Sequence, residues 1–486
     1  MSAPGTLAYV EYAREDSRPR IEWTWLPIAV AIVLVAWLAL VPLVFLLWAN
    51  LHGSVLLAAP IVVIYCMWAA AHNLRPVRRR TLAAIRRAVE PVEVEALARF
   101  LPAWQGVGRD SGRGLDRLRD VVAQLQGITL PVSAWETDVL PVRVPGYRPD
   151  MLDELCAGGE LVWIGAGAGR AALYLRGEAA LLHTPGEPSE HPIAAVLRAR
   201  GPLFFADLAA AVGEPDRAVL AELWALAWDG VITNDSWHPL RGGAVLRALP
   251  PPSPAGSGRS PRRSRPTSSL PAARGRWSLV ESLVAAAPAP AERVRALAET
   301  LLDRHGVLTR AAVLAEGVPG GFASVYGELR MMEEAGRCQR GYFVEGLGGA
   351  QFAAPTAVER LRDVRSADPD APAMVLAAID PANPYGATLP WPASARRPAR
   401  VAGAWIVTAA GRPALYVERG GRGLVTFDPD LLEPAVAALA DLVAAGRARR
   451  LAPERIDGEP IAGTEAERLL LAHGFLKGHR RLVLRA

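Results

Sequence analysis

The chain is poor in residues that form covalent or metal cross-links. It has three cysteines, and no two of them form a C-x-x-C pair. The histidines that lie near one another in sequence lack the i,i+4 spacing that puts two imidazoles on one helix face. We therefore expect no disulfide framework, no metal site and no cofactor. The cysteines are Cys66, Cys156 and Cys338.

The chain also lacks a nucleotide-binding phosphate loop. No G-x-x-x-x-G-K-[ST] motif occurs, and the glycine-rich run GAGAGR at residues 165–170 has neither the lysine nor the hydroxyl residue of that motif. We predict that this run is a turn in a β-hairpin. No ATPase or helicase activity is expected from this polypeptide alone.

Lysine is nearly absent, so arginine supplies the positive charge. Lys477 is the only lysine, yet Lys and Arg together number 54 against 49 acidic residues, for a net charge of +5. Arginine suits phosphate because its planar guanidinium donates two parallel hydrogen bonds. The small excess of positive charge allows a polyanionic partner without requiring one.

Two long uncharged runs lie near the N-terminus, at residues 26–48 and 51–71. Each is long enough to cross a bilayer as a helix. After an N-terminal tail at 1–22 we therefore predict a transmembrane hairpin at 23–74, embedded through residues 25–71. Arginines flank both ends, which places the hairpin in the cytoplasmic membrane and the rest of the chain in the cytoplasm. A faulty gene-model join near residue 75 is left open as the alternative.

The remainder of the chain repeats a helix, helix-turn-helix, wing pattern. In each copy a glycine ends the first helix and another ends the third, before a β-ribbon candidate. The pattern predicts a first winged-helix module at 78–186, a second winged helix at 187–250 and a third at 277–364. Equivalent positions in the second and third copies are Gly201 and Gly306, Leu223 and Leu329, and Gly230 and Gly336; Gly127 and Gly159 hold the glycine positions in the first.

Two further segments complete the predicted organisation. Residues 251–276 are rich in Pro, Ser, Gly and Arg, which predicts a disordered basic linker. Residues 365–486 contain three strand candidates, a helix and further short strands, which favour a small β-barrel-like domain. The predicted fold class is α+β: tandem winged-helix domains followed by a small β-barrel-like domain and preceded by a two-helix transmembrane hairpin.

Winged helices commonly bind nucleic acid, with the third helix in the major groove and the wing on the backbone. DNA is the expected partner, with RNA left open, and a protein-contact scaffold is the alternative. The candidate nucleic-acid-binding residues are Arg143, Arg148, Arg217, Arg241, Arg337 and Arg340.

From about residue 78 onward, the chain resembles the C-terminal region of the Lhr (large helicase-related) helicases. Long stretches carry the resemblance, among them QLQGITLPVSAWETDVLPVRVPGYRPDMLDELCAGGELVWIG, WDGVITNDSWHPLR and DPANPYGATLPWP. It implies a DNA-repair function without an ATPase in this chain, and a separate RecA-like motor as partner. The alternative is a membrane-anchored winged-helix transcriptional regulator or scaffold. The predicted hairpin is foreign to that family.

That region is in turn similar to the AlkZ/YcaQ-type DNA glycosylases, whose catalytic motif is Gln-x-Gln or Gln-x-Asp. The resemblance places the motif at Gln124 and Gln126 and implies glycosylase activity on damaged bases. A carboxamide can face the positive charge that develops on the sugar, but it cannot accept a proton as a carboxylate does. Removal of uracil would gain from a carboxylate, for which Asp120, Glu136 and Asp138 are the nearest candidates in sequence.

Overall fold

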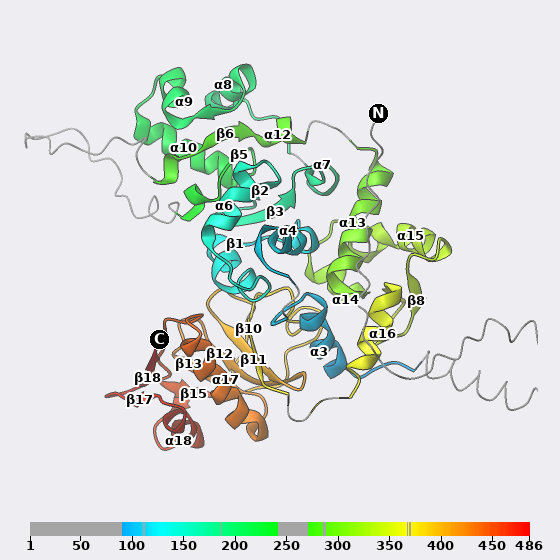
Figure 1. Ribbon diagram of the computed structural model, residues 1–486, viewed down its shortest axis with the longest axis vertical. Helices are drawn as coiled ribbons and strands as arrows, with labels where there is room; N and C mark the ends of the chain where they lie inside the picture. The colour runs from blue at the N-terminus through cyan, green and yellow to red at the C-terminus, as the bar shows by residue number, and fades with distance from the viewer. Residues whose placement is uncertain are drawn as a thin grey trace, which may run out of the picture. The chain divides into compact units, whose positions relative to one another are not determined.

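The computed structural model describes residues 90–109, 112–184, 186–241, 271–284, 288–366, 368 and 371–486. Its first winged helix follows the short helix α3 (Val94–Trp104) and holds a three-stranded antiparallel sheet in the order β1-β3-β2 (Figure 1). As predicted, the run GAGAGR forms the turn between β2 and β3. The elements are α4 (Gly114–Leu125), β1 (Leu130–Pro131), α5 (Val132–Ala134), η2 (Trp135–Val139), α6 (Pro149–Ala157), β2 (Leu161–Gly165), β3 (Arg170–Leu175) and α7 (Ala179–Leu182).

The second winged helix has the same sheet order, β4-β6-β5, and shares one hydrophobic core with the first. Its strand β6 pairs with both β4 and β5, although it lies about forty residues after β5 in the chain. The predicted linker therefore falls between two strands of this domain rather than between two domains. Residues 242–270 lie outside the described residues. The elements are α8 (Pro192–Arg200), β4 (Leu203–Phe204), α9 (Phe205–Val212), α10 (Asp216–Trp228), β5 (Ile232–Asn234), η4 (Pro271–Ala273), β6 (Arg276–Leu279) and α12 (Val280–Leu283).

The third winged helix again has a three-stranded sheet, in the order β7-β9-β8, around its own core. Helix α16 follows its wing and packs on α3. The elements are α13 (Pro290–His305), β7 (Val307–Leu308), α14 (Arg310–Ala315), α15 (Gly321–Glu334), β8 (Gln339–Gly341), β9 (Gln351–Ala353) and α16 (Pro355–Asp363).

The backbone confirms the predicted threefold repeat at its glycines. All six repeat glycines have a positive φ, between 64° and 83°. Residues with a side chain rarely adopt this conformation, so glycine marks the end of the first and third helices in each copy. The six are Gly127, Gly159, Gly201, Gly230, Gly306 and Gly336.

The C-terminal domain is built on an open sheet, so the predicted β-barrel-like fold is wrong. Six strands run in the order β10-β11-β12-β13-β15-β16, and the two end strands do not pair with each other. Helix α17 (Leu432–Ala444) packs against the sheet, and its residues Val436 and Leu439 share one hydrophobic core with Val407 and Leu415 of the sheet. The strands therefore need not close on themselves to cover that core. The sheet strands are β10 (Met374–Ala377), β11 (Trp405–Ala409), β12 (Arg412–Val417), β13 (Gly423–Thr426), β15 (Arg455–Ile456) and β16 (Glu459–Pro460).

A smaller antiparallel set, in the order β14-β18-β17, completes this domain. The three predicted strands of this region are β11 to β13, and the predicted helix after them is α17. The remaining elements are η5 (Pro429–Leu431), α17 (Leu432–Ala444), β14 (Arg450–Leu451), α18 (Glu465–Ala472), β17 (Leu476–Lys477) and β18 (Leu482–Arg485).

The membrane part of the predicted fold class also needs correction. In the described ranges no helix combines the length and apolar character needed to cross a bilayer. The longest helix there, α13, has 16 residues, whereas a span needs about 20. The predicted hairpin at 23–74 lies outside the described residues. The fold is therefore a mixed α/β arrangement of winged helices and an open sheet, and neither the membrane partner nor the membrane location is supported.

Candidate functional site

The C-terminal ends of α4 and α13 meet and join the first winged helix to the third. Gln124 Nε2 donates to the Asp303 carbonyl at 3.1 Å. In the opposite direction, Arg304 Nε donates to the Gln124 carbonyl at 3.1 Å, and Nη2 donates to the Gln126 carbonyl. The last carbonyls of a helix have no partner within it, so one guanidinium satisfies two of them at the end of α4.

Gln126 is held in a single orientation although it follows the last residue of α4. Its side chain is 4% exposed. Its Oε1 accepts from the Leu175 N–H at 3.3 Å, and its Nε2 donates to Glu178 Oε2 at 2.6 Å. An amide has two acceptor sites and two N–H donors, so one of each is still available.

Beside Gln126, Arg304 and His305 share the carboxylate of Glu316. Arg304 Nη1 donates to Glu316 Oε2, and His305 Nε2 lies 2.6 Å from Oε1. Burial raises the pKa of Glu316, but the Arg304 charge and the His305 hydrogen bond outweigh it and lower the pKa to about 2. At neutral pH this site therefore contains a fixed carboxylate.

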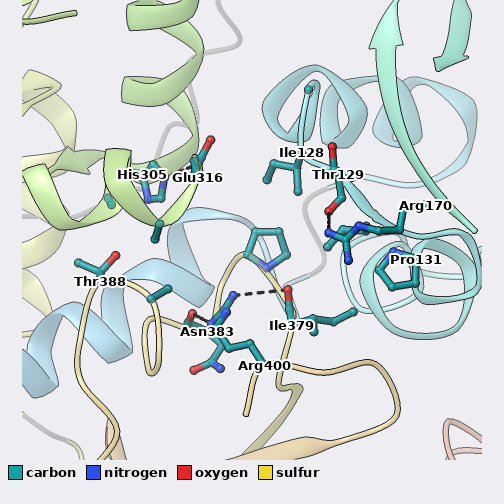
Figure 2. Close-up of a pocket in the computed structure, with 16 residues that line it drawn as sticks. Ile128, Thr129, Pro131, Arg170, His305, Glu316, Ile379, Asn383, Thr388 and Arg400 are labelled. Carbon is teal, nitrogen blue, oxygen red and sulfur yellow. Dashed lines mark hydrogen bonds and ion pairs between the residues drawn. The ribbon is translucent and has the colours of Figure 1, made fainter. Parts of the chain in front are cut away.

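Two cavities lie on either side of Gly127 and Glu316, which line both. The first, of about 410 Å³, is lined by residues of the first winged helix, the third winged helix and the C-terminal domain (Figure 2). His305 comes from the third winged helix, Arg170 from the first and Arg400 from the C-terminal domain. The second, of about 330 Å³, is lined by Gln126 and Arg304. Both volumes fall within the usual range of about 300–1,000 Å³ for small-molecule sites.

Both predicted glutamines lie at this junction, but of the two only Gln126 lines a cavity. Gln124 and the three predicted carboxylates line neither cavity. Glu136 pairs with Arg241, and Asp120 is exposed on α4. Asp138 is buried elsewhere, where burial raises its pKa against the effect of the Thr137 hydrogen bond.

Two of the predicted nucleic-acid-binding arginines are held in buried or partly buried ion pairs. Arg143 is fully buried and makes a bidentate ion pair with Asp380, so its predicted phosphate contact is corrected. Arg241 binds Glu136 and Asp153 at once. The four others lie at the surface: Arg148, Arg217, Arg337 and Arg340.

The third helices of the winged helices are not basic. Helix α6 carries Asp150, Asp153 and Glu154 and no basic residue. In α10 and α15, acidic residues also outnumber basic ones. Carboxylates are unfavourable beside phosphates. The surface of these three helices is therefore less suited to contact a DNA backbone than a winged-helix fold alone would predict.

Sequence reasoning missed Arg304, His305 and Glu316. The repeat contains a signal for one of them. In the third copy Glu316 stands immediately before the glycine that follows the second helix. The equivalent position in the second copy is Val212. A charge at a repeat position that is otherwise apolar indicates a local partner or a site.

Comparison with known proteins shows which families this chain is similar to. Residues 92–183 and 287–373 each match the description "Large helicase-related protein, winged-helix domain". The chain is 45% identical over 441 residues to a Mycolicibacterium smegmatis protein described as "Lhr helicase/ probable uracil glycosylase", and 37% identical over 461 residues to the Escherichia coli "Lhr helicase/uracil glycosylase". Each alignment covers 84% of this chain, which spans 29% and 30% of the length of these relatives.

Among solved structures, the chain is similar to the Streptomyces sahachiroi DNA glycosylase AlkZ. The TM-score is 0.46 at 16% identity, over 75% of this chain and all of that one.

Proposed function

Because this chain carries winged-helix domains of the large helicase-related protein family, we propose that it binds DNA and hydrolyses the N-glycosidic bond of a damaged base at the end of α4. The observation that carries the proposal is the immobilised amide of Gln126 at the wall of a cavity. The names of the two relatives, which include uracil glycosylase, point to the same reaction.

The chemistry requires a dipole that faces a developing cation. Cleavage of an N-glycosidic bond gives the sugar oxocarbenium character, as glycoside hydrolysis does. The carboxamide oxygens of Gln124 and Gln126 can face that charge, and they do so best when held in advance. Arg304 and the Leu175 N–H fix the backbone and the amide of this motif before substrate arrives.

The target base has to leave the stack to reach this junction. Enzymes that act on bases take them out of the helix into a pocket, and the phosphate backbone supplies most of the affinity. We propose the surface arginines as the phosphate contacts and a RecA-like motor as the partner that delivers DNA. These arginines are Arg148, Arg217, Arg337 and Arg340.

The experiment measures base release by the full chain. Oligonucleotides that carry uracil or an N7-alkylated purine are incubated with the protein, and abasic sites are scored after alkaline cleavage. We expect Gln126→Ala and Gln124→Ala to lose release by 100-fold or more while still binding the duplex, on the order of the effect of a preorganised transition-state contact.

Gln339→Ala is the matched control, because Gln339 is an exposed glutamine on the wing of the third winged helix. It should retain the wild-type rate. If wild-type protein binds the duplex tightly and releases no base, the region is a DNA-binding scaffold and the proposal is wrong.

A further inference from the structure

Tyr174 lies on strand β3 at the wall of the second cavity, which Gln126 also lines. The residues on either side of Tyr174 hold the motif in place. The Leu173 carbonyl accepts from the Gly127 N–H at 3.0 Å. The Leu175 N–H donates to Gln126 Oε1 at 3.3 Å. A Cβ placed on Gly127 would lie 3.6 Å from Cε1 of the tyrosine ring, so this ring lies against the candidate motif and shares its cavity.

The hydroxyl of Tyr174 is buried and unpaired within the part of the chain that the structure describes. The residue is 6% exposed, and its hydroxyl makes no hydrogen bond to any described residue. Buried polar groups are nearly always paired, so an unpaired hydroxyl at a cavity wall indicates a ligand that pairs with it. The other hydroxyl side chains that line this cavity are each bonded within the protein: Thr184, Thr300 and Ser324.

The charges at this cavity make the hydroxyl a hydrogen-bond donor. Burial raises the pKa of Tyr174 to about 12, opposed by the Arg304 charge, so the phenol keeps its proton at neutral pH. The same cation attracts the lone pairs of the phenol oxygen and leaves the hydrogen for a ligand. The carboxylate that lines the cavity, Glu316, is bound by Arg304 and His305. An entering base is therefore the partner that this hydrogen can find.

We propose that Tyr174 recognises the target base in the second cavity by donating a hydrogen bond to an exocyclic carbonyl oxygen of that base. The substrate class is then the bases that carry such a carbonyl, as guanine-type purines do. Adenine-type bases carry an amino group instead, which donates where Tyr174 also donates. This inference rests on the proposed function and adds to it the residue that selects the base.

The same contact favours departure of the base. Water bonds to C1′ and gives up a proton to solvent, and the electron pair of the broken C1′–N bond leaves with the base. A carbonyl oxygen of the base takes up part of that negative charge, so a donor that faces it binds the transition state more strongly than the ground state. Tyr174 keeps its proton, and a base that leaves as an anion takes its proton from solvent. Gln126 then acts on the sugar side of the breaking bond and Tyr174 on the base side.

The test measures single-turnover base release by the full chain, with the duplex saturated as judged by mobility shift. DNA treated with dimethyl sulfate supplies N7-methylguanine, which has an exocyclic carbonyl, and N3-methyladenine, which has only an amino group. A uracil duplex supplies a second carbonyl-bearing base. Tyr174→Phe keeps the ring and removes the hydroxyl. We expect release of carbonyl-bearing bases to fall about 10-fold, the effect of one hydrogen bond, and N3-methyladenine release to change less than about 3-fold.

Tyr416→Phe is the matched control, because Tyr416 is a buried tyrosine of the C-terminal domain that lines neither cavity. Its hydroxyl donates to the Ala399 carbonyl at 2.9 Å, so its loss should lower the melting temperature and leave the choice of base unchanged. Tyr174→Phe should not lower the melting temperature, because its hydroxyl has no partner within the protein to lose. A drop as large as that of Tyr416→Phe would show that the hydroxyl is bonded within the protein and would overturn the proposal.

The remaining outcomes separate this inference from the proposed function. Equal effects of Tyr174→Phe on carbonyl-bearing and amino-bearing bases, or no effect on either, overturn the role of Tyr174 and leave the proposed function intact. So does wild-type protein that releases N3-methyladenine alone. If wild-type protein releases only carbonyl-bearing bases, the fall in their release decides. Wild-type protein that releases no base overturns both.

Discussion

Arg304 Nε lies 3.1 Å from the carbonyl oxygen of Gln124, and this contact joins equivalent ends of two winged helices. Gln124 stands three residues before Gly127, and Asp303, whose carbonyl receives the Gln124 side chain, stands three residues before Gly306. The repeat thus brings the same position of two copies face to face. The candidate motif is built at that junction and not within one domain.

The first prediction concerns the shape of the Arg304 side chain. Arg304→Lys keeps the positive charge beside Glu316 but loses the planar fork that reaches both Gln carbonyls. We expect base release to fall at least 10-fold with little loss of stability. Arg304→Ala leaves the Glu316 carboxylate without its cation and should cost about 3–5 kcal/mol of unfolding free energy. Urea unfolding and single-turnover rates measure the two effects, and equal stability loss in both variants would contradict the account.

The second prediction concerns acid. The pKa of Glu316 is about 2 in the folded protein and ordinarily 4.5, because Arg304 and His305 outweigh the burial that raises it. A depressed folded pKa adds stability that is fully present above the unfolded value and is lost as the pH falls from about 4.5 towards 2. The stability difference between wild type and Glu316→Gln should therefore shrink across this window. Thermal melting at pH 7, 4.5 and 3 tests it; a difference that does not change with pH would rule out the fixed carboxylate.

The third prediction compares two repeat glycines. Both have positive φ, so alanine is strained at either position, by about 1–3 kcal/mol. A Cβ at Gly201 would meet nothing within 4 Å, whereas at Gly306 it would lie 2.6 Å from Phe100 Cζ and 2.9 Å from Trp104. Gly306→Ala should therefore lower the melting temperature well beyond Gly201→Ala. Equal shifts would show that α3 does not pack against this turn in solution.

The fourth prediction separates a buried arginine from exposed ones. Arg143→Ala leaves Asp380 buried without its cation and should cost about 3–5 kcal/mol of stability. Arg337→Ala and Arg340→Ala should change stability little, because both residues are exposed, but should weaken DNA binding and reduce its salt dependence. Titration of the duplex between about 50 and 200 mM salt measures this. Unchanged affinity and salt slope in both would place the DNA elsewhere.

Local patterns in the sequence predicted the elements of the fold well. Short stretches of sequence were enough to predict the glycines that end the helices, the apolar faces of the helices and the three strands β11 to β13. Short stretches could not predict which strands pair when the strands lie far apart in the sequence. Strand β6 lies far from β5 in sequence, and β15 joins β13 in parallel after α17, which extends the sheet instead of closing it.

The same limit applies to the candidate site. Gln124 and Gln126 could be found because a motif places them within three residues of each other. Arg304 lies 178 residues from Gln126, and Asp380 lies 237 from Arg143, so neither partner could be assigned from a local pattern. Exposure is equally invisible in sequence, which is why Arg143 resembled a phosphate contact.

The most direct test of the account is free uracil released in a single turnover, with the full chain in excess over a duplex that contains one labelled uracil. Saturation is first established by a mobility shift, so that binding and chemistry are measured separately. The account predicts release of one uracil per duplex, abolished in Gln126→Ala at the same saturation. A saturated duplex that keeps its uracil would contradict it.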